Sequence, residues 1–208
     1  MKLNLGIIWS FVNKWGEIMK DWTNYQTKTY GDNVYNLLIE FLDKYKVDNA
    51  IDLGCGSGNE TVYMIKKGIK VLAIDRQLNQ NFILSRLSDD EKKLLSLKES
   101  SFEDIELPKT QMLTAFFSIP FCNPNNFNEL WNKIYNSIED NGYFVGQLFG
   151  NRDAWNVVDS INTFPINKVK EYLKKYKIIK LEEVEFVRES DNKKWHYYDI
   201  IAQKKVGE

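Results

Sequence analysis

The sequence of 208 residues contains little cysteine and histidine: two of the first, Cys55 and Cys122, and one of the second, His196. Two thiols and one imidazole cannot supply the four ligands of an ordinary zinc site, so we expect no metal. A small secreted domain held by disulfides would carry more cysteine, and the N-terminus lacks the apolar core of a signal peptide, so we expect a cytoplasmic protein. No apolar run approaches the roughly 20 residues that span a bilayer, so we expect no membrane span.

An excess of positive charge is also missing, because 28 lysines and arginines face 29 aspartates and glutamates. Proteins that hold a nucleic-acid backbone usually carry a basic excess, so we do not expect nucleic acid as a partner. What the chain does have is a globular composition, with 43% apolar and 14% aromatic residues. Its length suits one domain with a sizeable core, and it leaves open whether two copies form a homodimer.

The N-terminal segment differs in pattern from the rest. Apolar residues between positions 8 and 22 recur at helical spacing and predict an amphipathic helix. The segment 22–31, rich in Thr, Asn and Tyr, predicts a loop. We therefore expect an N-terminal helix with a lid-like loop over residues 1–31 and one main domain over 32–208. Whether the helix covers a site or contacts another chain stays open.

From residue 32 onwards, buried strands alternate with amphipathic helices. Strands are predicted at 49–53, 69–75, 94–98, 112–119, 143–149, 178–188 and 195–203, and helices at 32–45, 60–67, 78–87, 127–138 and 169–176. The last two strands are joined by a short polar segment, 190–194, which predicts an antiparallel C-terminal hairpin. The alternation predicts an α/β fold, a Rossmann-like three-layer sandwich around a seven-stranded, mostly parallel sheet.

The turn between the first strand and the following helix carries the clearest chemistry. It reads Asp52-Leu53-Gly54-Cys55-Gly56-Ser57-Gly58-Asn59, a G-x-G-x-G with an acid two residues ahead. A dinucleotide fingerprint would place its third glycine where Asn59 stands, and a P-loop would need Gly-Lys-Ser/Thr, which is missing. Asp75 ends the second strand about 20 positions after the first glycine, the spacing of a carboxylate that accepts hydrogen bonds from ribose hydroxyls.

The glycine turn and Asp75 together resemble the class I S-adenosylmethionine-dependent methyltransferases, and the local pattern is most similar to small members such as the tellurite-resistance methyltransferases. The resemblance extends over about residues 32–204 and implies that 32–208 is a methyltransferase domain with S-adenosylmethionine as cofactor. In that family the glycine turn holds the methionine part, the acid holds the ribose, and the residues after the second and third strands border the adenine. The implied cofactor-binding residues are Asp52, Gly54, Cys55, Gly56, Gly58, Asp75, Arg76, Ser101 and Phe102.

The segment Ser118-Ile119-Pro120-Phe121 ends the predicted fourth strand, which faces the transferred methyl group in this family. It partly resembles the Asn/Asp/Ser-x-Pro-Tyr/Phe motif of enzymes that methylate amino groups of nucleobases or glutamine. The alternative is that Pro120 only ends the strand and Phe121 packs in the core. Candidate residues of the acceptor pocket are Tyr25, Tyr30, Ser118, Phe121 and Trp155, the last of which could equally cover the core.

No catalytic residue can be assigned from the sequence. Cys122 has no histidine near it and reads as a structural thiol, and His196 lies on a strand predicted at the sheet edge. The absence of an obvious general base favours an acceptor that is already nucleophilic, such as a thiolate, an amine or a metalloid anion. We expect methyl transfer from S-adenosylmethionine to a small-molecule acceptor; the alternatives are N-methylation of a nucleobase or protein amine, and cofactor binding without catalysis. The last is supported only by Gln111–Thr114, where many family members carry an acid.

Overall fold

The computed structural model describes residues 22–207, so the predicted N-terminal helix lies outside the described residues apart from Trp22. One seven-stranded sheet has the order β3-β2-β1-β4-β5-β7-β6. Its strands are β1 (Asn49–Leu53), β2 (Lys70–Asp75), β3 (Leu95–Glu99), β4 (Thr110–Ala115), β5 (Ile138–Phe149), β6 (Tyr176–Arg188) and β7 (Lys193–Lys204). The first five pair in parallel, and β7 is antiparallel to both β5 and β6, so the predicted sheet with its C-terminal hairpin is confirmed.

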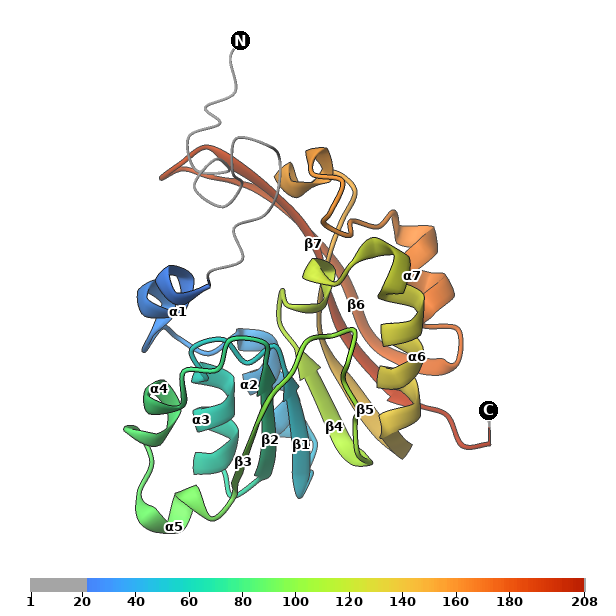
Figure 1. Cartoon of the computed structure of the whole chain (residues 1–208). Coiled ribbons are helices and arrows are strands. Elements are labelled where there is room, and N and C mark those ends of the chain that lie inside the picture. The colour runs from blue at the N-terminus through green and yellow to red at the C-terminus, as the bar shows by residue number, and fades with distance from the viewer. Residues whose placement is uncertain (1–21, 208) are drawn as a thin grey trace.

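The helices connect these strands and cover both faces of the sheet (Figure 1). They are α1 (Thr23–Thr29), α2 (Asn36–Lys44), α3 (Asn59–Lys66), α4 (Gln80–Leu84), α5 (Asp89–Lys92), α6 (Phe127–Ser137) and α7 (Ile166–Tyr172), with short 3-10 turns at Ile119–Phe121, Pro124–Asn126 and Ala154–Val157. No helix of the described part is long and apolar enough to cross a membrane.

The sequence prediction is wrong at several local points, of which three concern whole elements. Residues 23–29 form the helix α1 where a loop is predicted, because contacts with the segment after β2 hold a sequence of low helix propensity. The predicted helix 78–87 is shorter, and a separate α5 follows it, started by a capping box between Ser88 and Glu91. The predicted turn at 140–142 lies inside β5, with Asn141 at a φ of 63°.

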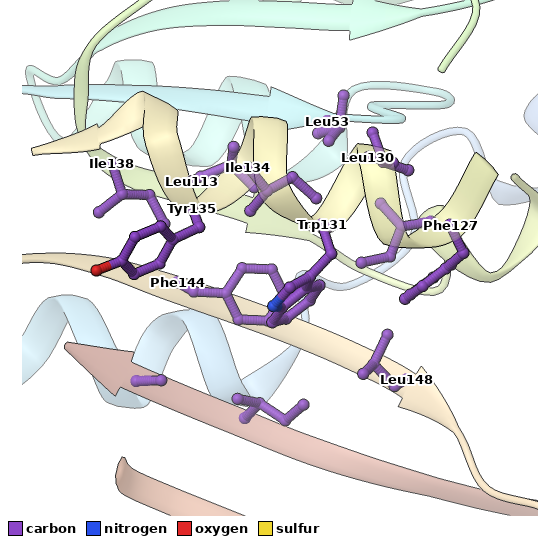
Figure 2. Close-up of a cluster of buried hydrophobic side chains, with 14 of the residues drawn as sticks. Leu53, Leu113, Phe127, Leu130, Trp131, Ile134, Tyr135, Ile138, Phe144 and Leu148 are labelled. Carbon is purple, nitrogen blue, oxygen red and sulfur yellow. The ribbon is translucent and has the colours of Figure 1, made fainter. Parts of the chain in front are cut away.

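Two of the three hydrophobic clusters in residues 22–207 lie on opposite faces of the sheet. Consecutive strand residues point to opposite faces, so Leu113 and Phe144 belong to the cluster under α6, while Met112 and Val145 belong to the cluster under α2 and α3. Figure 2 shows the first cluster, in which Trp131 and its neighbours on α6 point towards β4 and β5. The expected three-layer sandwich is therefore confirmed.

The β6–β7 hairpin reaches past the end of β5. The pairing of β7 with β5 stops at Tyr197, opposite Phe149, whereas its pairing with β6 continues to Lys193. Since β7 runs antiparallel to β5, this overhang lies at the edge where the parallel strands have their carboxyl ends. The prediction that His196 lies on an edge strand is wrong, because β7 is inserted between β5 and β6.

Candidate active site

Backbone hydrogen bonds connect the glycine turn after β1 to the end of β2. The N–H groups of Gly54 and Cys55 both donate to the carbonyl of Ile74, at 2.7 and 2.9 Å. Gly54, Gly56 and Gly58 all have positive φ, at 77°, 54° and 75°, where side chains are strained. These dihedrals explain why the turn needs glycine at alternate positions.

Each glycine of the turn also has its own steric surroundings. A Cβ at Gly54 would overlap with the Cβ of Ser118, and one at Gly58 would overlap with the side chain of Ile83. A Cβ at Gly56 would meet nothing within 4 Å. The outer two glycines therefore permit close packing against protein, whereas the middle one leaves open space in which a ligand can approach the backbone.

Asp75 lies beside this open space at the carboxyl end of β2. One carboxylate oxygen accepts the N–H of Gly56 at 2.9 Å, and the other accepts the N–H of Gln77 at 3.0 Å. Burial raises the pKa of Asp75, and these two backbone hydrogen bonds oppose the rise. Each carboxylate oxygen has two lone pairs, so each oxygen can still accept a hydrogen bond from a hydroxyl group. Arg76, next in the chain, is exposed, with its guanidinium 5.8 Å from the centre of the Trp22 ring.

Asp52 and Cys55, for which the family resemblance implies a place at the cofactor, are buried beneath the turn. The two carboxylate oxygens of Asp52 accept hydroxyl hydrogen bonds from Thr61 at 2.5 Å and from Thr114 at 3.1 Å. Burial raises the pKa of Asp52 to about 6, and it also raises the pKa of the Cys55 thiol. The Asp52 side chain thus braces the turn between α3 and β4.

Ser101 and Phe102 follow β3 on the other side of Asp75. The Ser101 hydroxyl donates to the Asp104 carboxylate at 2.8 Å and accepts the Asp104 N–H at 3.2 Å. Phe102 is half-buried against the core, and its ring lies 3.5 Å from where a Cβ on Gly54 would be. The segment therefore borders the glycine turn, with an aromatic ring next to it.

The end of α1 crosses the glycine turn and is held there by Asn59. The Asn59 amide donates to the carbonyl of Thr29 at 2.8 Å, and its oxygen accepts the N–H of Gly31 at 3.2 Å and Arg86 Nη1 at 2.6 Å. Thr29 also exchanges hydroxyl hydrogen bonds with Ser57. We refer to this group as the clasp; it places the predicted lid segment directly against the turn.

A hollow of about 500 Å³ opens between α1 and the segment that follows β2. It is lined by Thr23, Gln26, Gln77, Leu78, Asn79, Gln80, Asn81 and Glu99. Gln77 joins its two sides, because its side-chain oxygen accepts the N–H of Trp22 and its carbonyl accepts the Gln26 amide, each at 2.6 Å. The hollow is polar and adjoins Asp75 through Gln77.

Aromatic rings gather where β4 and β5 end and where the β6–β7 hairpin overhangs them. We call this group the aromatic wall; it consists of Phe117, Phe121, Phe149, Trp155, Trp195 and Tyr197. Phe117 is central, with ring centroids 5.3 Å from Phe149, 5.4 Å from Trp195 and 5.1 Å from Tyr197. Its φ of 48° is an outlier for a bulky residue, a kind of strain that concentrates at functional sites.

The five residues predicted for the acceptor pocket do not all meet. Phe121 and Trp155 belong to the wall, with ring centroids 5.9 Å apart, and Trp155 is buried. Tyr25 is 39% exposed beside Trp22, which touches Phe121. Tyr30 lies instead over Phe82, Ser85 and Arg86. The Ser118 hydroxyl donates to the carbonyl of Leu53 at 2.5 Å, beneath the glycine turn.

Sequence reasoning missed Glu60 and Tyr35. Glu60 is in the first turn of α3, where an acid reads as an ordinary helix-start residue. Its carboxylate accepts the N–H of Tyr35 at 3.4 Å, and burial raises its pKa to about 7. The only available signal was its place two residues after Gly58. Phe117, Trp195 and Tyr197 were missed for another reason. Phe117 is about 80 positions from the other two, and they meet because β7 lies next to β5 in the sheet.

Cys122 and His196 have structural surroundings. Cys122 is buried, and its thiol donates to the carbonyl of Asn123. His196 is fully buried, and Nδ1 accepts the backbone N–H of Arg152 at 2.9 Å. Nε2 therefore carries the proton and donates to Glu183 at 2.8 Å. Within residues 22–207, no group of three or more His, Cys, Asp or Glu residues is arranged to hold a metal ion.

Several solved structures have a similar fold. TehB from Haemophilus influenzae superposes with a TM-score of 0.70 and 19% identity, over 88% of this chain and 66% of that chain. The 1,6-didemethyltoxoflavin-N1-methyltransferase of Burkholderia thailandensis, solved with 1,6-didemethyltoxoflavin and S-adenosylhomocysteine, gives a TM-score of 0.70 and 14% identity, over 88% of this chain and 84% of that one. These likenesses show the fold.

Sequence comparison extends the match. The carboxy-S-adenosyl-L-methionine synthase of Yersinia enterocolitica is 24% identical over 145 residues, which cover 66% of this chain and 54% of the synthase. The chain spans between about a third and about half the length of the curated relatives it matches. The family model described as tellurite resistance protein TehB matches residues 10–194. The chain therefore belongs to the TehB family, within the class I S-adenosylmethionine-dependent methyltransferases.

Proposed function

We propose that this chain transfers a methyl group from S-adenosylmethionine to a small-molecule acceptor. One observation carries the proposal: the Gly56 N–H donates to Asp75 across the end of the sheet, so an open glycine turn and a ribose-type carboxylate share one edge. The open space at Gly56 would admit the methionine part of the cofactor, and Asp75 would accept its ribose hydroxyls. The bound cofactor supplies an electrophilic methyl group on a sulfonium.

The aromatic wall would orient the acceptor. The buried indole N–H of Trp195 has no hydrogen-bond partner among the described residues, although buried donors are normally satisfied. The ammonium of Lys193 lies 3.7 Å from the centre of the Trp195 ring and 4.8 Å from that of Trp155, and burial lowers its pKa to about 8. Flat rings, an unpaired donor and a desolvated amine favour a flat acceptor that carries an oxygen or another hydrogen-bond acceptor.

Ser118 distinguishes this proposal from N-methylation of a nucleobase or protein amine. In that alternative the Ser118 hydroxyl would contact the amine, but here it donates to Leu53 and supports the turn. The alternative of cofactor binding without catalysis makes a different prediction: S-adenosylmethionine binds, but no methyl group is transferred to any acceptor.

The first test is calorimetric titration of the protein with S-adenosylmethionine, with NAD as the control ligand. We expect binding of the methyl donor alone, weakened by about 10- to 100-fold in Asp75→Ala, since hydrogen bonds to charged groups contribute about 1.5–3 kcal/mol. Asp75→Asn keeps one oxygen acceptor for the backbone. If the turn stays folded, its affinity for S-adenosylmethionine should lie between those of the wild type and Asp75→Ala.

Asp89→Ala is the matched control, because Asp89 is an exposed acid on α5. It should bind the donor as the wild type does. The proposed function would be wrong if the protein did not bind S-adenosylmethionine or bound NAD instead. It would also be wrong if Asp75→Ala bound the donor as tightly as the wild type does. Labelled methyl transfer to thiols, amines, phenols and oxyanions then separates an enzyme from a binding protein.

A further inference from the structure

Glu60 connects the glycine turn with the end of β4. Its half-buried carboxylate accepts the backbone N–H of Tyr35. The Tyr35 ring stacks on Phe116, with 4.9 Å between centroids, and meets Phe117 edge-on at 5.6 Å. Glu60 and the first residues after β4 therefore lie on two sides of the same tyrosine.

The sheet order places these residues at a crevice. β1 and β4 are neighbours, but the chain continues outward to β2 and β3 on one side and to β5 on the other. Such a reversal opens a crevice beyond the carboxyl ends of the two central strands, where ligands bind in open α/β sheets. Glu60, in α3 after β1, and Phe117, after β4, both lie at this carboxyl edge, with Tyr35 in contact with each.

Groups on several elements set the protonation of Glu60. Burial and the Asp52 charge on β1 raise its pKa, while the backbone N–H groups of Glu60 and Tyr35 and the Arg86 charge lower it. The neighbours whose own pKa values respond to the Glu60 charge are Tyr25, Tyr35, Cys55 and Arg86. A carboxyl balanced near neutral pH can accept a proton in one step and release it in the next.

We propose that Glu60 is the general base of this site and that the acceptor is therefore an un-ionised thiol, hydroxyl or amine. The inference rests on the proposed function. The acceptor atom forms a bond to the methyl carbon while the methyl–sulfur bond breaks, and the electron pair of that bond stays on sulfur. The proton of the acceptor atom passes to the Glu60 carboxylate and then to water. This differs from the expectation, based on sequence, that no base takes part.

The test compares paired acceptors that differ in ionisation. Benzyl mercaptan and 4-methylphenol are largely protonated at neutral pH, whereas thiophenol and pentafluorophenol are largely ionised. Labelled methyl transfer to each is measured for the wild type, Glu60→Gln and Glu129→Gln. Glu129 is the matched control, because it is likewise an acid in the first turn of a helix, α6, but lies outside the site. Glu60→Gln keeps an oxygen for the Tyr35 N–H, and calorimetry with S-adenosylmethionine checks that its site is intact.

We expect Glu60→Gln to slow transfer to the protonated acceptors by about 100-fold or more and to change transfer to the ionised ones by less than about fivefold. It should also remove the limb of the pH–rate profile near pH 7. Equal slowing for both members of a pair, or no slowing, overturns the role of Glu60 and leaves the proposed function standing. If the wild type binds the donor but methylates neither protonated acceptor, the role of Glu60 as a base for thiols and hydroxyls is overturned.

Discussion

The two sides of the crevice are built in different ways. The side with the glycine turn comes from one short stretch, residues 52–77, and is held mainly by backbone hydrogen bonds at the ends of β1 and β2. The opposite side, the aromatic wall, comes from residues 117–197 and is held by ring contacts between β4, β5 and β7. A local backbone motif suits a ligand that stays the same across proteins of one fold. The side chains of the wall can be replaced without changing the fold, so the ligand that they contact can differ.

The largest effect that would separate the two sides is expected at Gly54. Alanine there would have a strained φ and would also overlap with Ser118, so we expect Gly54→Ala to lower the free energy of unfolding by about 3 kcal/mol or more. S-adenosylmethionine binding should be lost as well. Chemical denaturation and calorimetry measure the two losses.

Gly68→Ala controls for strain alone. Gly68 has a φ of 84° at the end of α3, and a Cβ there would meet nothing within 4 Å. The variant should lose only about 1–2 kcal/mol and bind the donor normally. Equal losses in the two variants would show that the contact between Gly54 and Ser118 has no special importance.

The pH dependence of stability tests the brace beneath the turn. Because the pKa of Asp52 is about 6 in the folded protein and near 3.8 when unfolded, the folded state keeps its proton longer. The stability from this group is therefore full below pH 3.8 and is lost as pH rises through 6. Relative to Asp52→Asn, the wild type should lose about 2 kcal/mol between pH 4 and pH 7. Chemical denaturation measures both variants at both pH values. An equal difference in the free energy of unfolding between them at pH 4 and at pH 7 would contradict this.

A smaller effect, confined to the wall, is expected from Trp195→Phe. The change keeps an aromatic ring but removes the indole N–H, which has no hydrogen-bond partner within residues 22–207. We expect KM for an acceptor that carries an oxygen to rise by about 10-fold, as the loss of one hydrogen bond implies, while S-adenosylmethionine binding is unchanged. Phe186→Leu, on the exposed outer side of the Trp195 ring, is the control. A change in donor affinity in Trp195→Phe would show that the two sides are not independent.

The smallest effect is expected at Tyr30. Its hydroxyl makes one exposed contact with Ser85 at 3.3 Å, and its ring lies by Arg86, away from the wall. Tyr30→Phe should change acceptor KM by less than about twofold, because an exposed hydrogen bond contributes little. Steady-state kinetics measures this, and a large rise in KM would place Tyr30 with the acceptor after all.

The same contrast explains what could be predicted from the sequence. The glycine turn and Asp75 were found because strand, turn and helix follow one another in the chain, and the spacing reflects a fixed local geometry. The sheet with its hairpin was likewise predicted from hydrophobic periodicity. α1 was missed because Gln77, about 50 residues away, holds it in place.

The members of the wall, and Glu60, could not be assigned in the same way. Trp195 and Phe117 meet only because β7 inserts beside β5, an order that periodicity does not contain. Glu60 looks like any acid at a helix start, and its burial and its contact with Tyr35, which separate it from Glu129, come from the fold. Ser118 matched a motif, yet its hydroxyl is used by the turn.

The position of β7 also has a consequence for synthesis. It is the last strand along the described chain, yet it occupies an interior place in the sheet, between β5 and β6. A nascent chain on the ribosome can complete the glycine turn and Asp75 early, because β1, β2 and their helices precede it by more than a hundred residues. Until Lys193–Lys204 emerges, β5 and β6 lack their shared partner and the aromatic wall lacks Trp195 and Tyr197. A translating protein would therefore complete the glycine turn well before the aromatic wall.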